Sequence, residues 1–170
     1  TDGNKDKEGR TTNAVSMVSP DGTRIIHVLP AQLDPQLATP ATYALAVAIY
    51  LDMTLDRNSM EKITVVLDVR AGTGWANPTP LSLVPFIKIV ASLLNSHFPE
   101  RLSRLVLFPL PWAATFLFNN VKKTFLDQDT ACKIEVCPGP GNNDSPVPEQ
   151  LGQFFNDNVI QTMEDRRVSL

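Results

Sequence analysis

Short apolar runs alternate with longer helix-like segments along most of this chain, and the alternation predicts its elements. The run Ile63–Val69 (ITVVLDV) is almost continuously apolar and rich in β-branched residues. Such a run is typical of a parallel strand that is buried on both faces. We therefore expect a central strand at Ile63–Val69.

A start signal that occurs twice in the sequence predicts two helices. A Thr-Pro pair at 39–40 and another at 79–80 each place a capping hydroxyl before a proline at the first helical position. The first pair opens an alanine-rich helix over 41–55, which is apolar around most of its circumference, and the second opens a helix that ends near Ser96.

Further strands are predicted at Thr23–Leu29, Arg104–Phe108 and Cys132–Cys137, and a helix at Trp112–Leu126. The apolar run Ala14–Ser19 precedes a Pro-Asp-Gly turn, so it should form a hairpin with the strand that follows. Strand and helix alternate in the way of βαβ units with right-handed crossovers. The predicted fold class is α/β, with a mainly parallel β-sheet covered by helices.

The two ends of the chain differ from its middle. Residues 1–13 are charged and lack periodicity, which predicts a disordered tail before a single domain over 14–170. Residues 138–148 (PGPGNNDSPVP) hold too many prolines and glycines for an element, so we expect a loop there. A C-terminal helix is predicted over 149–166.

Composition narrows the classes of function. A net charge of -3 argues against a nucleic-acid surface. Cys132 and Cys137 should point to opposite faces of one strand, which excludes a disulfide between them and predicts reduced, buried thiols. The longest apolar run, 44–51, is far shorter than the roughly 20 residues of a membrane-spanning helix. We expect a cytoplasmic protein without structural zinc.

Candidate catalytic groups are few. Asp68 lies near the end of the predicted central strand and could act as a base or a ligand, but a cap on the following loop is the favoured interpretation. His27 and His97 have no recognisable metal-ligand partners in the sequence. Since no reactive set can be assembled, we expect a binding protein without a cofactor and not an enzyme.

The predicted helix Trp112–Leu126 carries two kinds of side chain. One face is apolar, and the other combines aromatic rings with lysines. An interfacial helix on anionic lipid has this pattern, and so does a sheet-covering helix whose lysine stems lie over apolar surface. The side chains concerned are Trp112, Phe116, Leu117, Phe118, Val121, Lys122, Lys123 and Phe125.

Lys133 stands at the start of the predicted strand 132–137, on the same face as Glu135. A lysine on a buried strand needs a partner to offset its desolvation. Either Glu135 or a bound anion could be that partner.

With these features the chain resembles the CRAL-TRIO lipid-binding family, and within it the phosphatidylinositol-transfer proteins. The segment Phe98–Arg101 (FPER) is similar to the family's aromatic-Pro-Glu-Arg turn, and the strand ending at Pro111 to the one that follows it. Trp112–Leu126 resembles the gate helix, and 125–134 (FLDQDTACKI) the link to the next strand.

The resemblance implies that Glu100, Thr130 and Lys133 hold an inositol-phosphate headgroup, while acyl chains occupy an apolar cavity under the gate helix. A lysine suits a phosphodiester, a threonine hydroxyl a phosphate or inositol, and a carboxylate inositol hydroxyls. The expected function is binding, with possible intermembrane transfer, of phosphatidylinositol or a phosphoinositide by a peripheral membrane protein. The alternative is a non-enzymatic module of the same fold that binds a protein partner within a larger protein.

Overall fold

The computed structural model describes residues 17–72, 79–125, 128–142 and 144–169, so the predicted tail at 1–13 lies outside the described residues. Four parallel strands form one sheet in the order of the chain: β1 (Arg24–Val28), β2 (Ile63–Asp68), β3 (Leu102–Leu110) and β4 (Ile134–Pro138). This confirms the predicted α/β class.

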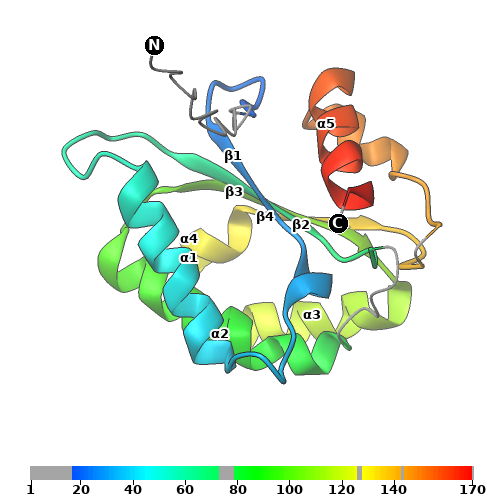
Figure 1. The fold of residues 1–170 in the computed structure, drawn as a ribbon, viewed down its shortest axis with the longest axis horizontal. Coiled ribbons are helices and arrows are strands. Elements are labelled where there is room, and N and C mark those ends of the chain that lie inside the picture. Colours follow the sequence, from blue (N-terminus) through cyan, green and yellow to red (C-terminus); the bar gives the residue numbers. More distant parts are fainter. Residues whose placement is uncertain (1–16, 73–78, 126–127, 143, 170) are drawn as a thin grey trace, which may run out of the picture.

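The helices lie in two layers, one on each face of the sheet (Figure 1). The crossover helices α1 (Pro40–Thr54), α2 (Pro80–His97) and α3 (Trp112–Phe125) cover one face. Because the strands follow chain order and crossovers share one hand, all three helices must lie on the same side. The other face is covered by α5 (Asp157–Val168) and the short 3-10 helix η2 (Glu149–Gln153).

Both predicted Thr-Pro helix starts are confirmed. The hydroxyl of Thr39 accepts the backbone N–H of Thr42 at 3.2 Å, and the hydroxyl of Thr79 accepts that of Ser82 at 3.3 Å. Each helix begins at the proline after its cap, where the missing N–H costs no hydrogen bond. A second 3-10 helix, η1 (Pro30–Gln32), precedes α1.

Strand β2 has no exposed residue on either face, which explains its continuous apolar run. Alternate residues of β2 point to opposite sides: Val66 packs with Val106 and Phe108 against the α5 layer, while Ile63 packs with Leu51 and Leu55 of the α1 layer. The core against α5 also contains Met17, Ile25, Cys137, Leu151, Phe155, Val159 and Met163.

Within the described part of the N-terminal hairpin, from residue 17 onward, one antiparallel bridge joins Val18 and Arg24. Gly22 takes a left-handed φ of 82° in the turn, a conformation that glycine adopts without cost. Residues 14–16 of the predicted first strand lie outside the described residues.

The predicted strand at 132–137 was wrong at its start. Residues Gln128–Cys132 form a short helix, α4, and β4 begins at Ile134. The backbone N–H of Lys133 donates to the carbonyl of Thr130 at 3.2 Å, which closes a helical turn where an extended strand was expected. Cys132 is consequently exposed, against the prediction of two buried thiols, while Cys137 is buried and both are free.

The single C-terminal helix predicted over 149–166 is also wrong, because the segment is divided. Helix η2 ends at Gln153, and α5 starts at Asp157 after a cap by Asn156, whose side-chain oxygen accepts the N–H of Val159 at 2.9 Å. A side chain that satisfies the first turn of a new helix favours a break at that point. In the described ranges, no helix is long and apolar enough to cross a membrane.

Candidate functional site

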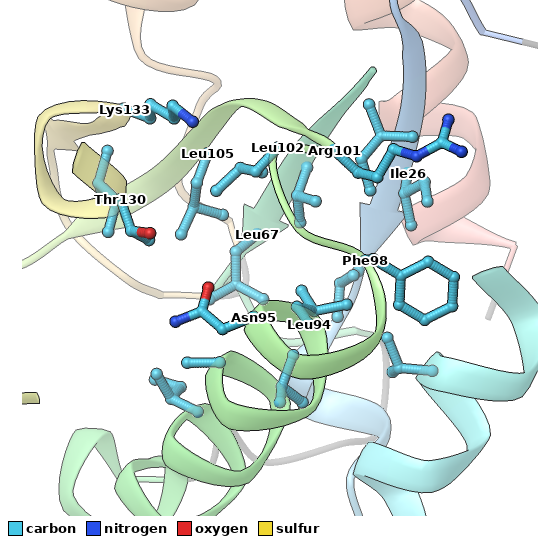
Figure 2. Close-up of a pocket in the computed structure, with 18 of the residues that line it drawn as sticks. Ile26, Leu67, Leu94, Asn95, Phe98, Arg101, Leu102, Leu105, Thr130 and Lys133 are labelled. Atoms are coloured by element: carbon cyan, nitrogen blue, oxygen red, sulfur yellow. The ribbon is translucent and has the colours of Figure 1, made fainter. Parts of the chain in front are cut away.

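An apolar cavity of about 160 Å³ lies between the sheet and the layer of crossover helices (Figure 2). Its floor consists of the strand residues that do not face α5, among them Val65 and Leu67 of β2 and Leu105 of β3. Helix α1 contributes Val47 and Leu51. The inner face of α2 contributes Phe86, Ile87, Val90, Ala91 and Leu94.

Polar groups also line the cavity, and they include all three residues implied by the resemblance. Glu100, Thr130 and Lys133 line this one pocket, although thirty residues separate the first from the second. Figure 2 shows Thr130 and Lys133 on one side of it and Arg101 on the opposite side.

Asn95 also lines the pocket, and the sequence interpretation missed it. It follows Ile87 and Ala91 at intervals of four along α2, and both of these line the same pocket. Side chains at this spacing share one face of a helix. A helical projection of α2 anchored on its apolar face would therefore have identified Asn95.

Glu100 occupies a tight turn between α2 and β3. The backbone N–H of Arg101 donates to the carbonyl of Phe98 at 3.3 Å, and Glu100 takes a left-handed φ of 59°. Few residues other than glycine adopt this conformation, and its cost is of order 1–3 kcal/mol. This strained turn places Glu100, which is an exposed residue, in the lining of the cavity.

Lys133 lies between α4 and β4, and not on the strand face that was predicted for it. Its carbonyl accepts the N–H of Leu105 at 2.9 Å, which fixes its backbone against β3. Within the described part of the chain, no carboxylate oxygen, that of Glu135 included, lies within 4 Å of its ammonium group. The charge of Lys133 is therefore half-buried at the cavity without an acidic partner among these residues.

Helix α3 forms part of the cavity wall. Phe118 lines the cavity, whereas Phe116 points away from the core with 73% of its surface exposed. The ammonium group of Lys122 donates to the carbonyl of Ile134 at 3.2 Å, which ties α3 to β4. The side chains of Trp112, Leu117, Val121, Lys123 and Phe125 lie outside what the structure describes.

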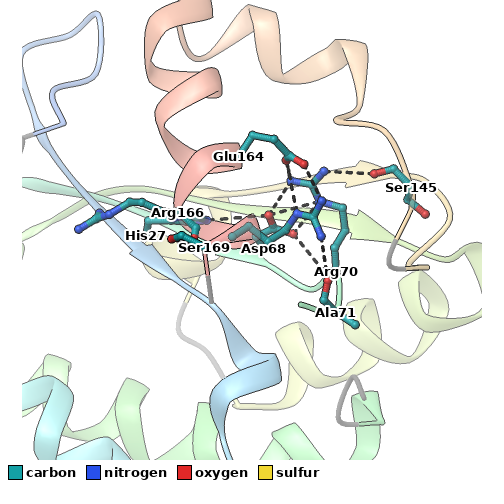
Figure 3. A network of polar contacts seen from close by, with 9 residues as sticks. His27, Asp68, Arg70, Ala71, Ser145, Glu164, Arg166 and Ser169 are labelled. Atoms are coloured by element: carbon teal, nitrogen blue, oxygen red, sulfur yellow. Dashed lines mark hydrogen bonds and ion pairs between the residues drawn. The ribbon is translucent and has the colours of Figure 1, made fainter. Parts of the chain in front are cut away.

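A second polar cluster lies on the opposite face of the sheet, beneath α5 (Figure 3). Arg70, only 1% exposed in its side chain, donates to Asp68 at 2.8 Å and to Glu164 of α5 at 2.7 Å. It also donates to the carbonyl of Ser145 at 3.1 Å. Nε2 of His27 lies 3.9 Å from Asp68, beyond hydrogen-bond distance.

Asp68 accepts the backbone N–H of Arg70 at 3.0 Å, which confirms the favoured interpretation of this residue as a cap on the loop after β2. The sequence interpretation missed its partner Arg70, although the two stand only two positions apart. Glu164 lies 94 positions after Arg70, and nothing in the sequence indicated that the two would pair. Asp68, Arg70 and Glu164 are satisfied by ion pairs with one another, and these pairs attach α5 to the sheet.

The electrostatics of this cluster keep both acids ionised. Burial alone would raise the pKa of Asp68, but the imidazole of His27 and the guanidinium of Arg70 lower it by more, so that it lies below its usual value. Burial likewise raises the pKa of Glu164, and its contacts with Arg167 and Arg70 lower it to below the usual value. Charge pairing thus outweighs desolvation at both carboxylates.

Acid should weaken this attachment. A carboxylate whose folded-state pKa is lowered stabilises the fold above its unfolded pKa of about 4, and this contribution is lost as the pH falls through the folded value. The difference in unfolding free energy between wild type and Glu164→Gln should be constant above about pH 5 and shrink below about pH 4. Urea denaturation from pH 7 to pH 3 measures it. A difference that does not change with pH would contradict the assignment.

Comparison with known proteins agrees with this geometry. The family model of the CRAL/TRIO domain matches residues 13–162, and the chain therefore belongs to this family of lipid-binding domains. A curated relative, the phosphatidylinositol transfer protein PDR17 of Saccharomyces cerevisiae, is 30% identical over 107 residues. These residues are 61% of this chain and 29% of that protein, so the chain spans less than a third of the relative's length.

Proposed function

We propose that this chain binds a phospholipid, with phosphatidylinositol or a phosphoinositide as its preferred ligand. The observation that carries the proposal is the shared pocket: an apolar cavity whose lining includes Glu100, Thr130 and Lys133. Acyl chains would enter the apolar part, and the headgroup would stay with the polar groups. The yeast relative is named a phosphatidylinositol transfer protein, which supports the same class of ligand.

Each polar side chain suits one part of the headgroup. The Lys133 ammonium group would pair with the phosphodiester, for which no acid within 4 Å competes among the described residues. The hydroxyl of Thr130 can donate to a phosphate oxygen or accept from an inositol hydroxyl, and the carboxylate of Glu100 can only accept. Inositol, which is rich in hydroxyl donors, satisfies such a set better than choline does.

The size of the cavity places a condition on binding. Ligand pockets commonly measure about 300–1,000 Å³, and this cavity of about 160 Å³ is smaller. A phospholipid therefore requires one wall to move outward. Helix α3 is the proposed lid, because Phe118 on its inner side closes the cavity while Phe116 on its outer side is exposed.

The exposed side of α3 would also meet the membrane. An exposed aromatic ring on a helix that covers an apolar cavity suits insertion into the headgroup layer. If α3 contacts the membrane, the cavity opens toward lipid and not toward water. Acyl chains could then pass between the membrane and the cavity without crossing an aqueous phase. We propose a peripheral, transient association of this kind, followed by transfer of the lipid between membranes.

A second candidate function is supported by the small volume of the cavity. A module of this fold with a filled interior could bind a protein partner and carry no lipid. The two functions differ in what the purified protein retains and takes up.

Native mass spectrometry of the purified protein, combined with solvent extraction, separates them. The lipid-binding function predicts a stoichiometric phospholipid in the spectrum, or uptake of phosphatidylinositol from vesicles by protein purified without it. A well-folded sample that repeatedly carries no lipid and takes none up would overturn the proposal in favour of the protein-binding module.

A further inference from the structure

Arg101 is one of the residues that line the cavity, and its guanidinium binds the loop between α1 and β2. Its Nη1 donates to the carbonyl of Glu61 at 2.8 Å and to Oγ of Ser59 at 3.4 Å. Its Nη2 donates to the carbonyls of Asp56 at 2.8 Å and Arg57 at 3.2 Å. Both terminal nitrogens are thus engaged with protein oxygens from one short loop.

The backbone of Arg101 is fixed at the same place. Its carbonyl accepts the N–H of Ile63 at 2.8 Å, which joins the turn to the start of β2. On the other side of Glu100, the N–H of Phe98 donates to the carbonyl of Leu94 at 2.8 Å, and the ring of Phe98 packs against the core on that face. The strained residue Glu100 therefore lies between two anchored neighbours.

A strained backbone conformation persists only where its surroundings determine it. Glu100 itself is exposed and lines the cavity, so its neighbours supply the anchor. Phe98 anchors one side of the turn, and Arg101 anchors the other with a planar guanidinium that reaches three carbonyls at once. A lysine ammonium is a point charge and could not match this arrangement.

We propose that Arg101 is the positioning residue for Glu100. Arg101 holds the strained turn so that the Glu100 carboxylate stays at the cavity rim. If the proposed function holds, this carboxylate accepts hydrogen bonds from inositol hydroxyls there. Arg101 acts through Glu100 and offers its terminal donors to the loop at 56–61 and not to the headgroup. Selectivity for the headgroup would then depend on a contact outside the pocket.

The test compares uptake of phosphatidylinositol and of phosphatidylcholine from vesicles. Arg101→Gln should weaken phosphatidylinositol binding about tenfold, the size expected for loss of a hydrogen bond to a charged group, and leave phosphatidylcholine binding unchanged. Glu100→Gln should show the same loss, and the double variant no more than either single one. Arg101→Lys should fall between the wild type and Arg101→Gln.

Arg57→Gln is the matched control. It removes a cation from the same loop, but the side chain of Arg57 is exposed and pairs with Asp52, so both lipids should bind as in the wild type. An equal loss of both lipids in Arg101→Gln would show a merely structural role and overturn the inference, as would unchanged binding of both. If Arg101→Gln does not fold, the milder Arg101→Lys carries the same comparison.

A measurement without lipid keeps the inference separate from the proposed function. The Glu100→Gly variant should have a higher melting temperature than the wild type, because glycine adopts the left-handed conformation without strain. The same change should raise it less in the Arg101→Gln background, where the turn is free to relax. Equal gains in both backgrounds would overturn the positioning role. Failure of the wild type to take up any lipid would overturn only the proposed function.

Discussion

Replacement of Arg70 by methionine is expected to lower the free energy of unfolding at pH 7 by about 3–5 kcal/mol. Arg70 is the buried link between Asp68 on β2 and Glu164 on α5. Without it, Asp68 keeps the backbone N–H of residue 70 and the imidazole of His27 3.9 Å away, but it remains fully buried and has lost its guanidinium partner. Urea denaturation followed by circular dichroism measures the loss.

Two further variants make this prediction specific. Arg57→Met breaks an ion pair whose side chains are exposed, and such pairs contribute about 0–1 kcal/mol. The double variant Asp68→Leu with Arg70→Met removes the buried acid together with its partner, and should recover much of the stability lost by Arg70→Met alone. If Arg70→Met and Arg57→Met cost the same, the buried cluster contributes no more than a surface pair.

The location of the loss matters as much as its size. Arg167 of α5 donates to the carbonyl of Ala71 at 2.9 Å, so a second arginine joins α5 to the loop after β2. Glu164 also pairs with Arg167, and these contacts together attach α5 to the carboxyl end of the sheet. Hydrogen exchange should therefore show α5 losing protection before the strands do in the Arg70→Met variant.

Replacement of Lys133 by alanine is expected to weaken phosphatidylinositol binding by about 10- to 100-fold, which corresponds to a charge-assisted hydrogen bond of roughly 1.5–3 kcal/mol. The unfolding free energy should change by less than about 0.5 kcal/mol, as for most substitutions away from the core. Lys133 is half-buried at the cavity, and its proposed partner is the phosphodiester. Titration with vesicles containing phosphatidylinositol measures the affinity.

Lys62→Ala is the control for this variant. It removes the same charge from an exposed position outside the cavity lining, so binding should match that of the wild type. Vesicles with and without added salt separate specific binding from general attraction to an anionic surface, since salt screens only the second strongly. Equal phosphatidylinositol binding by Lys133→Ala and the wild type would contradict the site assignment.

Local sequence signals were sufficient for most elements of the fold. The central strand at Ile63–Asp68 was predictable because burial on both faces leaves a continuous apolar run. The starts of α1 and α2 were predictable because a threonine cap acts within three residues of itself. The errors fell at 132–133 and 154–156, where a helical turn and an asparagine cap replaced the predicted strand and the predicted continuous helix.

The sequence by itself thus determined the α/β class and the parallel sheet, because each strand and helix shows its own local pattern and these patterns alternate along the chain. The candidate residues Glu100, Thr130 and Lys133 followed from the family resemblance and stay predictions. The tertiary structure decided that these residues line one cavity with Asn95. It also decided that Arg101 anchors a strained turn and that Arg70 joins Asp68 to Glu164. Such contacts depend on how segments that are distant in the sequence pack together. The type of one residue does not specify which distant residue it will contact.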